Sequence, residues 1–166
     1  FCAKTAVLKA ELESAGYVFS GSEALKLTLL TKKRGYEGQE LAEILRKERI
    51  ECEFADKDHL VLMLTPQTGD EGLERLKRAL LSVTPRCEIK MAPPRLTKPC
   101  RAMSVREATF ALGETVSVKD SLGRVLSSAN VGCPPAVPIA ACGEVIDERA
   151  IEAFEYYGIE TCRVVK

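Results

Sequence analysis

The segment from Cys133 to Ile146 constrains the fold more than any other part of the sequence, because Pro134, Pro135 and Pro138 fall within five residues. Each proline ring fixes φ and removes a backbone donor, so this segment can form neither a helix nor a central strand. We predict a rigid loop here. Such stiffness is typical of a structural crossing or of the wall of a binding site.

The end of this loop presents a carboxylate. Gly143 permits a backbone conformation or a close approach that a side chain would forbid, and Glu144 follows it just before the next regular element. Two interpretations of Glu144 stay open: it takes part in function, or it caps a helix or pairs with an arginine. Cys133 and Cys142 bracket the loop, but neither has a neighbouring histidine that would raise its thiolate fraction, so we expect no nucleophile here.

Composition excludes several classes of protein. Lys plus Arg equals Asp plus Glu at 24 each, so no net charge favours nucleic acid or an anionic membrane. No apolar run approaches a bilayer span, and no signal peptide is recognisable, so we expect a cytoplasmic protein. The seven cysteines are scattered without a CxxC pair and the chain has one histidine, which favours buried reduced thiols over disulfides or a zinc site.

Residues 1–83 are predicted to form a helix followed by a small sheet-and-helix domain. Leu25, Leu27 and Leu29 alternate with polar residues, as in a half-buried strand, and Thr68 with Glu71 has capping-box spacing before an amphipathic helix. The expected elements are a helix over 3–15, a strand over 25–30, a helix over 37–49, strands over 50–54 and 60–64, and a helix over 68–83. This β, α, β, β, α order after the first helix is typical of an α+β fold.

The proline-containing stretch 84–102 has no apolar period and is predicted to be a linker or an extended crossing arm. Residues 103–166 are predicted to form a second small α+β domain. Its first helix starts at a capping box formed by Ser104 and Glu107, and Asp147 caps its last helix. The strands are expected over 114–118, 124–131 and 159–165.

Two charged clusters have a structural and a functional interpretation. Asp56, Asp58 and His59 could hold a metal ion, but acidic residues are also favoured in a hairpin turn because they bond their own backbone, so we predict no metal site. The run from Lys32 to Arg34 could attract a phosphate to the following helix. A solvated loop is the favoured interpretation, because no phosphate-loop spacing of glycines accompanies these charges.

A family resemblance rests on the order of residues in the second half of the chain. The matching segments are Met103-Ser104-Val105-Arg106-Glu107-Ala108, then Gly123-Arg124, then Cys133-Pro134-Pro135-Ala136-Val137-Pro138-Ile139, and the pair Gly143-Glu144. They resemble the C-terminal domain of the bacterial ornithine/lysine/arginine decarboxylases, which are pyridoxal-phosphate enzymes of the aspartate-aminotransferase fold type. Cys133, Ala136 and Cys142 replace a Tyr, a Gly and a Pro of that pattern, while the spacing is kept.

The resemblance implies a C-terminal fragment, an expectation that also agrees with a sequence that opens at Phe1 inside a predicted helix. The family's cofactor lysine follows a Ser, any residue and a His, whereas His59, the only histidine here, precedes Leu60. The resemblance therefore implies a missing large domain that binds pyridoxal 5'-phosphate, with no cofactor bound to this fragment alone. It also implies a basic amino-acid substrate contacted by Glu144 and Cys133, and a homo-oligomer. The alternative is a free-standing, non-catalytic module that binds a ligand or dimerises.

Overall fold

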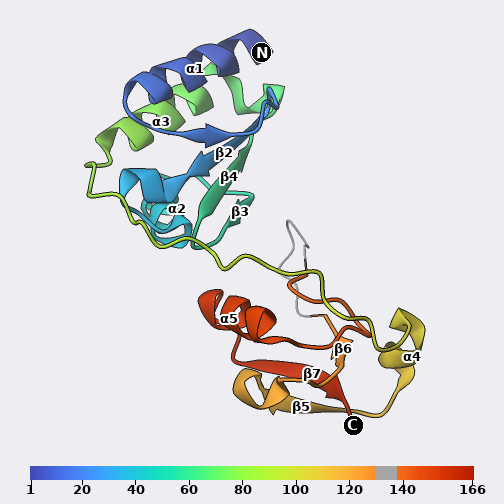
Figure 1. The fold of residues 1–166 in the computed structure, drawn as a ribbon. Helices are drawn as coiled ribbons and strands as arrows, with labels where there is room; N and C mark the ends of the chain where they lie inside the picture. Colours follow the sequence, from blue (N-terminus) through green and yellow to red (C-terminus); the bar gives the residue numbers. More distant parts are fainter. Residues whose placement is uncertain (130–137) are drawn as a thin grey trace. The chain divides into compact units, whose positions relative to one another are not determined.

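The computed structural model describes residues 1–129 and 138–166, and the chain folds into two compact units, Phe1–Ala92 and Pro93–Lys166. Each unit combines helices with one small antiparallel sheet (Figure 1). The predicted α+β class is therefore confirmed. No helix in the described part of the chain is long and apolar enough to cross a membrane.

The first unit is a four-stranded antiparallel sheet with the order β1-β2-β4-β3, covered by helices (Figure 1). The register pairs Leu27 with Leu62 and Leu29 with Leu60, and all four side chains are buried. These leucines form one core with buried leucines of all three helices, which therefore share one face of the sheet. The elements are α1 (Cys2–Ser14), β1 (Phe19–Ser20), β2 (Lys26–Leu30), the 3-10 helix η1 (Thr31–Arg34), α2 (Gly38–Lys47), β3 (Phe54–Ala55), β4 (His59–Met63), the 3-10 helix η2 (Pro66–Thr68) and α3 (Gly69–Ser82).

Two local predictions for this unit were wrong. The strand predicted over 50–54 is reduced to β3, because only Phe54 and Ala55 pair with β4. The capping box expected at Thr68 and Glu71 does not form; Thr65 and Thr68 form one instead, at the start of η2. On α1 the buried face contains Thr5, Leu8 and Leu12, whereas Val7 is 60% exposed.

The second unit is a three-stranded antiparallel sheet with the order β5-β7-β6. Its core includes Leu126, Ile146, Phe154 and Val164, each at most 1% exposed. Both predicted helix caps are present: Ser104 and Glu107 form a capping box, and the Asp147 carboxylate accepts a hydrogen bond of 2.7 Å from the Ala150 amide. The elements are α4 (Val105–Phe110), β5 (Gly113–Ser117), the 3-10 helix η3 (Val118–Ser121), β6 (Leu126–Ser128), α5 (Glu148–Tyr156) and β7 (Thr161–Val165).

The start of the proline-containing stretch lies along the first unit. The Arg86 amide donates to the Arg34 carbonyl at 3.1 Å, and the Ile89 amide donates to the Lys32 carbonyl at 3.0 Å. The Arg86 guanidinium also lies over the Tyr36 ring, 4.0 Å from its centroid. These contacts hold residues 84–91 against η1, although residues 84–91 form no helix or strand.

Candidate functional site

Glu144 closes the turn at the end of the proline-rich segment. The Ala141 amide donates to Glu144 Oε2 at 2.7 Å, and the Glu144 amide donates to the Ala141 carbonyl at 3.1 Å. Gly143 has φ +88, and a Cβ there would lie 2.3 Å from the Met103 carbonyl oxygen. Only glycine fits this position, so the turn that aims Glu144 depends on it.

Two neighbouring segments fix the backbone of Glu144. The Leu126 amide donates to the Glu144 carbonyl at 2.9 Å, and the Val145 amide donates to the Cys100 carbonyl at 2.8 Å. Arg101 forms an isolated antiparallel bridge with Glu144. Residues 143–146 therefore lie between β6 and residues 100–103, which positions the carboxylate on a rigid support.

The other residues predicted for this site are only partly placed. Cys133, Pro134 and Pro135 lie outside the described residues. Pro138 is exposed. Glu144 is half-buried, and its Oε1 accepts no hydrogen bond from the described residues. One carboxylate oxygen is thus committed to the turn, and the other is available to a donor from elsewhere.

A hollow of about 420 Å³ lies beside this segment, at the start of α5. Leu122, Val145 and Ile146 contribute its apolar lining. Asp147 lies at its edge, where the Thr97 hydroxyl donates to Oδ2 at 2.7 Å. That hydrogen bond, together with the one from the Ala150 amide, holds the pKa of Asp147 below its usual range. Both oxygens of Asp147 are engaged, so this carboxylate stabilises the start of α5.

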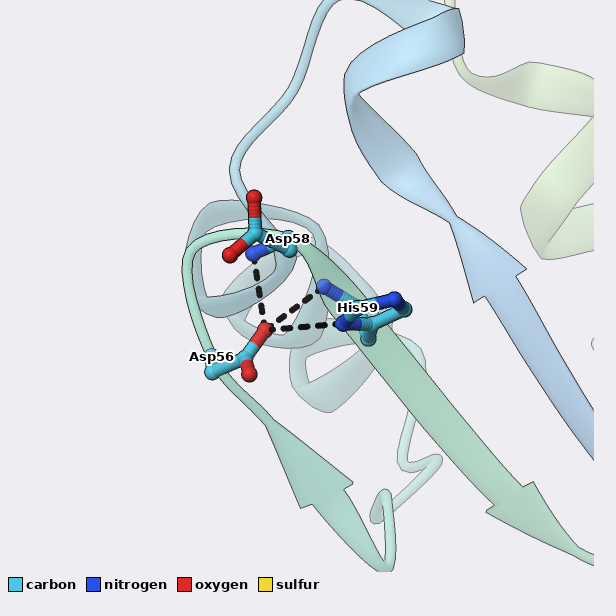
Figure 2. A group of neighbouring side chains, drawn as sticks. All are labelled: Asp56, Asp58 and His59. Carbon is cyan, nitrogen blue, oxygen red and sulfur yellow. Dashed lines mark hydrogen bonds and ion pairs between the residues drawn. The ribbon is translucent and has the colours of Figure 1, made fainter. Parts of the chain in front are cut away.

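Asp56, Asp58 and His59 lie together in the turn between β3 and β4, where Figure 2 shows the Asp56 carboxylate directed at its two neighbours. Asp56 Oδ1 accepts hydrogen bonds of 2.7 Å from the amides of both Asp58 and His59, and lies 3.5 Å from His59 Nδ1. Burial raises the pKa of Asp56, but the donors of His59 and Asp58 outweigh it and lower the pKa overall. The Asp56 side chain pairing raises the pKa of His59.

The ligand atoms of these three residues lie within 4.8 Å of one another, a separation that could suit a metal ion. However, the Lys32 ammonium already lies 2.8 Å from the buried Asp58 carboxylate. Asp56 is engaged with its own turn. The geometry therefore supports the structural interpretation, in which Lys32 supplies the positive charge.

The run from Lys32 to Arg34 does not form a phosphate-binding loop. Lys32 pairs with Asp58, and the Lys33 ammonium pairs with the Glu88 carboxylate at 2.6 Å. Arg34 is only 8% exposed and donates to the carbonyls of Ala15 and Val83. Sequence reasoning missed this buried arginine, because nothing in a run of three basic residues distinguishes the one that enters the core.

The described cysteines form no disulfide. The six that are described carry free thiols, and Cys2, Cys87 and Cys100 are exposed rather than buried as expected. Burial raises the pKa of the Cys52 thiol to about 11, which suppresses its thiolate.

Comparison with known proteins relates the chain to bacterial decarboxylases named for basic amino acids, as the sequence resemblance predicted. It is 28% identical over 133 residues to the arginine decarboxylase of Bacillus subtilis, and 28% identical over 132 residues to that of Halalkalibacterium halodurans. The matches cover 76% and 74% of this chain but only 27% and 26% of those proteins. The chain thus spans about a quarter of the length of these relatives. No protein-family model matches it.

Solved structures give the same relationship at the level of the fold. The lysine decarboxylase LdcF of Francisella novicida matches with a TM-score of 0.64 at 13% identity, over 87% of this chain and 31% of that one. The constitutive lysine decarboxylase of E. coli matches with a TM-score of 0.56 at 15% identity, over 87% of this chain and 32% of that one. Both units therefore contribute to a fold that occurs within larger enzymes.

Proposed function

We propose that this chain is the C-terminal part of a decarboxylase of basic amino acids, comprising the small domain and the C-terminal domain of a fold-type-I enzyme. The observation that carries the proposal is the match of three quarters of the chain to about a quarter of two arginine decarboxylases. The proposed enzyme is cytoplasmic and oligomeric. Its domain boundaries are those expected from the sequence: 1–83, a linker over 84–102, and 103–166.

The residues of this chain do not fit a cofactor site. The only histidine, His59, is committed to the Asp56 turn, and no Ser-any-His-Lys sequence is present. Pyridoxal 5'-phosphate would therefore be held by a large domain outside these 166 residues, where it would supply the electron sink for loss of carbon dioxide. The role left to this chain is to recognise the substrate and to close the site.

Glu144 is the proposed contact for the far end of the substrate. A basic side chain needs a carboxylate there, because burying an ammonium or guanidinium group without a partner is costly. Support comes from the rigid turn that holds Oε2 and from the absence of a described hydrogen-bond donor at Oε1. Cys133, at the other end of the loop, is the second proposed contact.

The test uses the full-length protein, obtained by reading the gene in frame upstream of Phe1 and assaying carbon dioxide release from arginine, lysine and ornithine. Activity on at least one of them is expected. Glu144→Gln should raise KM roughly tenfold or more for that substrate, because a charge-assisted hydrogen bond is lost. Glu148→Gln, at an exposed carboxylate on the first turn of α5, is the matched control and should leave KM unchanged.

The two parts of this proposal can fail separately. No release of carbon dioxide from any basic amino acid would overturn the activity. An unchanged KM in Glu144→Gln, with activity present, would overturn only the role of that residue. A start codon within a few residues of Phe1 would favour the alternative, a free-standing module that binds a ligand without catalysis.

A further inference from the structure

Residues 84–91, which we call the strap, lie along the surface of the first unit without entering its core. Each of these residues is exposed except Ile89, which is half-buried. None of their side chains belongs to the hydrophobic core of the first unit. Since apolar burial is the main favourable term in folding, the strap depends on polar contacts for its attachment.

Side chains of the first unit hold the strap at its two ends. The Tyr36 hydroxyl donates to the Thr84 carbonyl, and the Lys32 ammonium donates to the Met91 carbonyl, both at 2.8 Å. The same ammonium pairs with the buried Asp58 carboxylate. Because this ion pair does not involve the strap, detaching the strap exposes hydrogen-bonding groups to water but leaves no buried charge unpaired.

Gly35 provides the seat for the middle of the strap. It has φ +84, and a Cβ there would lie 2.6 Å from both the Arg86 Cβ and the Cys87 carbonyl oxygen. A Cβ essentially never comes so close to other atoms, so only glycine lets the strap backbone reach this position. The three atoms nearest to that Cβ all belong to the strap, which makes Gly35 a specific point of contact with it.

Two exposed ion pairs complete the attachment. Lys33 pairs with Glu88 at 2.6 Å, and Arg86 pairs with Glu40 at 2.7 Å. The four side chains are between 45% and 53% exposed. Dissolved salt screens exposed pairs strongly and buried pairs much less. Salt therefore weakens the attachment of the strap more than it weakens the core beneath it.

We propose that the strap is released by salt while the first unit stays folded. Local opening costs little free energy where contacts are few, polar and exposed. The hydrogen bond from Thr97 to Asp147 fixes the start of the second unit. With the strap attached, residues 92–96 connect the strap to this contact; with the strap released, the connection lengthens to residues 84–96. Ionic strength thus sets the length of the tether between the units. The proposal does not depend on the decarboxylase assignment.

Hydrogen exchange followed by NMR tests the proposal in the 166-residue chain. The Arg86 and Ile89 amides report the strap, and the Leu64 amide, which donates to the Leu25 carbonyl at 2.7 Å, reports the sheet. The two strap amides should exchange roughly threefold to tenfold faster in about 1 M sodium chloride than in low salt, and Leu64 should not. Strap amides that exchange at the rate of Leu64, or that salt does not accelerate, would overturn the proposal.

Removal of the two ion pairs tests the cause. Glu40→Gln/Glu88→Gln should accelerate exchange of the strap amides in low salt and abolish most of their response to salt. The matched control is Glu71→Gln, which removes an exposed pair with Arg75 from the first turn of α3 and should leave the strap as in the wild type. An undiminished salt response in the double variant would contradict the proposed role of these pairs.

The seat is tested by adding a methyl group. Gly35→Ala should accelerate exchange of the strap amides in low salt, because its Cβ displaces the strap backbone. Gly69→Ala is the control, since Gly69 has φ +64 and a Cβ there would meet nothing within 4 Å, so it adds backbone strain without a contact. Strap amides that are equally protected in both variants would contradict the seat at Gly35. If Gly35→Ala does not fold, the charge variants still decide the proposal.

Discussion

The guanidinium of Arg34 lies over the ring of Tyr17, with its central carbon 4.5 Å from the ring centroid. Arg34 donates to the Ala15 carbonyl at 2.5 Å and the Val83 carbonyl at 3.1 Å, and the Tyr17 hydroxyl donates to the Leu80 carbonyl at 2.6 Å. These carbonyls belong to the C-terminal ends of α1 and α3, where the helix dipole favours a cation. The pair therefore joins the ends of two helices around a buried positive charge.

Arg34→Met should lower the free energy of unfolding by about 3 kcal/mol, because it leaves the buried Val83 carbonyl and the partly buried Ala15 carbonyl without donors while keeping most of the side-chain volume. Urea unfolding followed by circular dichroism measures the change. Lys33→Met is the matched control, since the Lys33 side chain is about half exposed and its surface ion pair contributes at most about 1 kcal/mol. Equal losses in the two variants would show that the carbonyl contacts of Arg34 contribute little.

The His59–Asp56 pair predicts a pH dependence with a definite sign. Asp56 raises the folded-state pKa of His59 above its unfolded value of about 6.5. The stabilisation is therefore complete below about pH 6.5 and is lost as the pH rises through the raised folded pKa. The free energy of unfolding of the wild type relative to His59→Gln should fall across that window.

Proton NMR measures the same effect without assignment, since the chain has one histidine. In the wild type, the midpoint of the imidazole titration should lie above the pKa of His59 in the unfolded state. Asp56→Asn should lower that midpoint. A midpoint that is the same in both proteins would exclude Asp56 as the cause.

Arg49 is the only described non-glycine residue with positive φ, at 61°. It follows α2, where its amide donates to the Arg46 carbonyl and the Ile50 amide donates to the Leu45 carbonyl, the pattern of a helix end that favours glycine. Arg49→Gly should raise the free energy of unfolding by up to about 1 kcal/mol, because the left-handed strain is removed. Arg49→Ala keeps the Cβ and should give no gain; an equal gain would point to the loss of the exposed charge instead.

The buried Lys32–Asp58 pair predicts how the neighbouring turn responds to substitution and to metals. Lys32→Met should lower the free energy of unfolding by about 3 kcal/mol, because it leaves a buried carboxylate without its cation. The double variant Lys32→Met/Asp58→Leu should lose less than Lys32→Met alone.

The same pair predicts that neither chelator nor zinc shifts the thermal unfolding of the wild type, since Lys32 already supplies the cation. A clear stabilisation by zinc that disappears in Asp56→Asn would contradict the structural interpretation of the cluster.

Local patterns predicted the helices and the central strands because their signals lie within one element. The period of Leu73, Leu76 and Leu80 fixes the buried face of α3 whatever packs against it, and Asp147 caps α5 through a donor three residues away. The alternation of Leu27 and Leu29 identified β2 in the same way. The sequence also predicted a backbone conformation or close approach at Gly143 that a side chain would forbid, and Gly143 has a positive φ of 88°.

Features that depend on distant partners could not be predicted. β1 has only two residues, Phe19 and Ser20, and exists because β2 offers an edge. Conversely, Ile50 and Cys52 alternate like a strand but have no paired neighbour, so the expected strand is reduced to two residues. From the sequence, Arg34 is expected to be a surface cation. It is buried only because the ends of α1 and α3 meet around it in the fold.

Because Arg34 bonds to carbonyl oxygens, we expect its contribution to the stability of the first unit to be insensitive to acid and to salt. Carbonyl oxygens, unlike carboxylates, are not protonated as the pH falls, so acid does not remove the acceptors of the hydrogen bonds by which Arg34 links α1 and α3. Burial also shields it from dissolved ions. A change of pH alters the protonation of His59 in its turn, but it does not alter the carbonyl acceptors of Arg34. Hydrogen exchange should therefore find amides near β3 and β4 opening as the solution becomes alkaline, while the ends of both helices stay protected to the same degree.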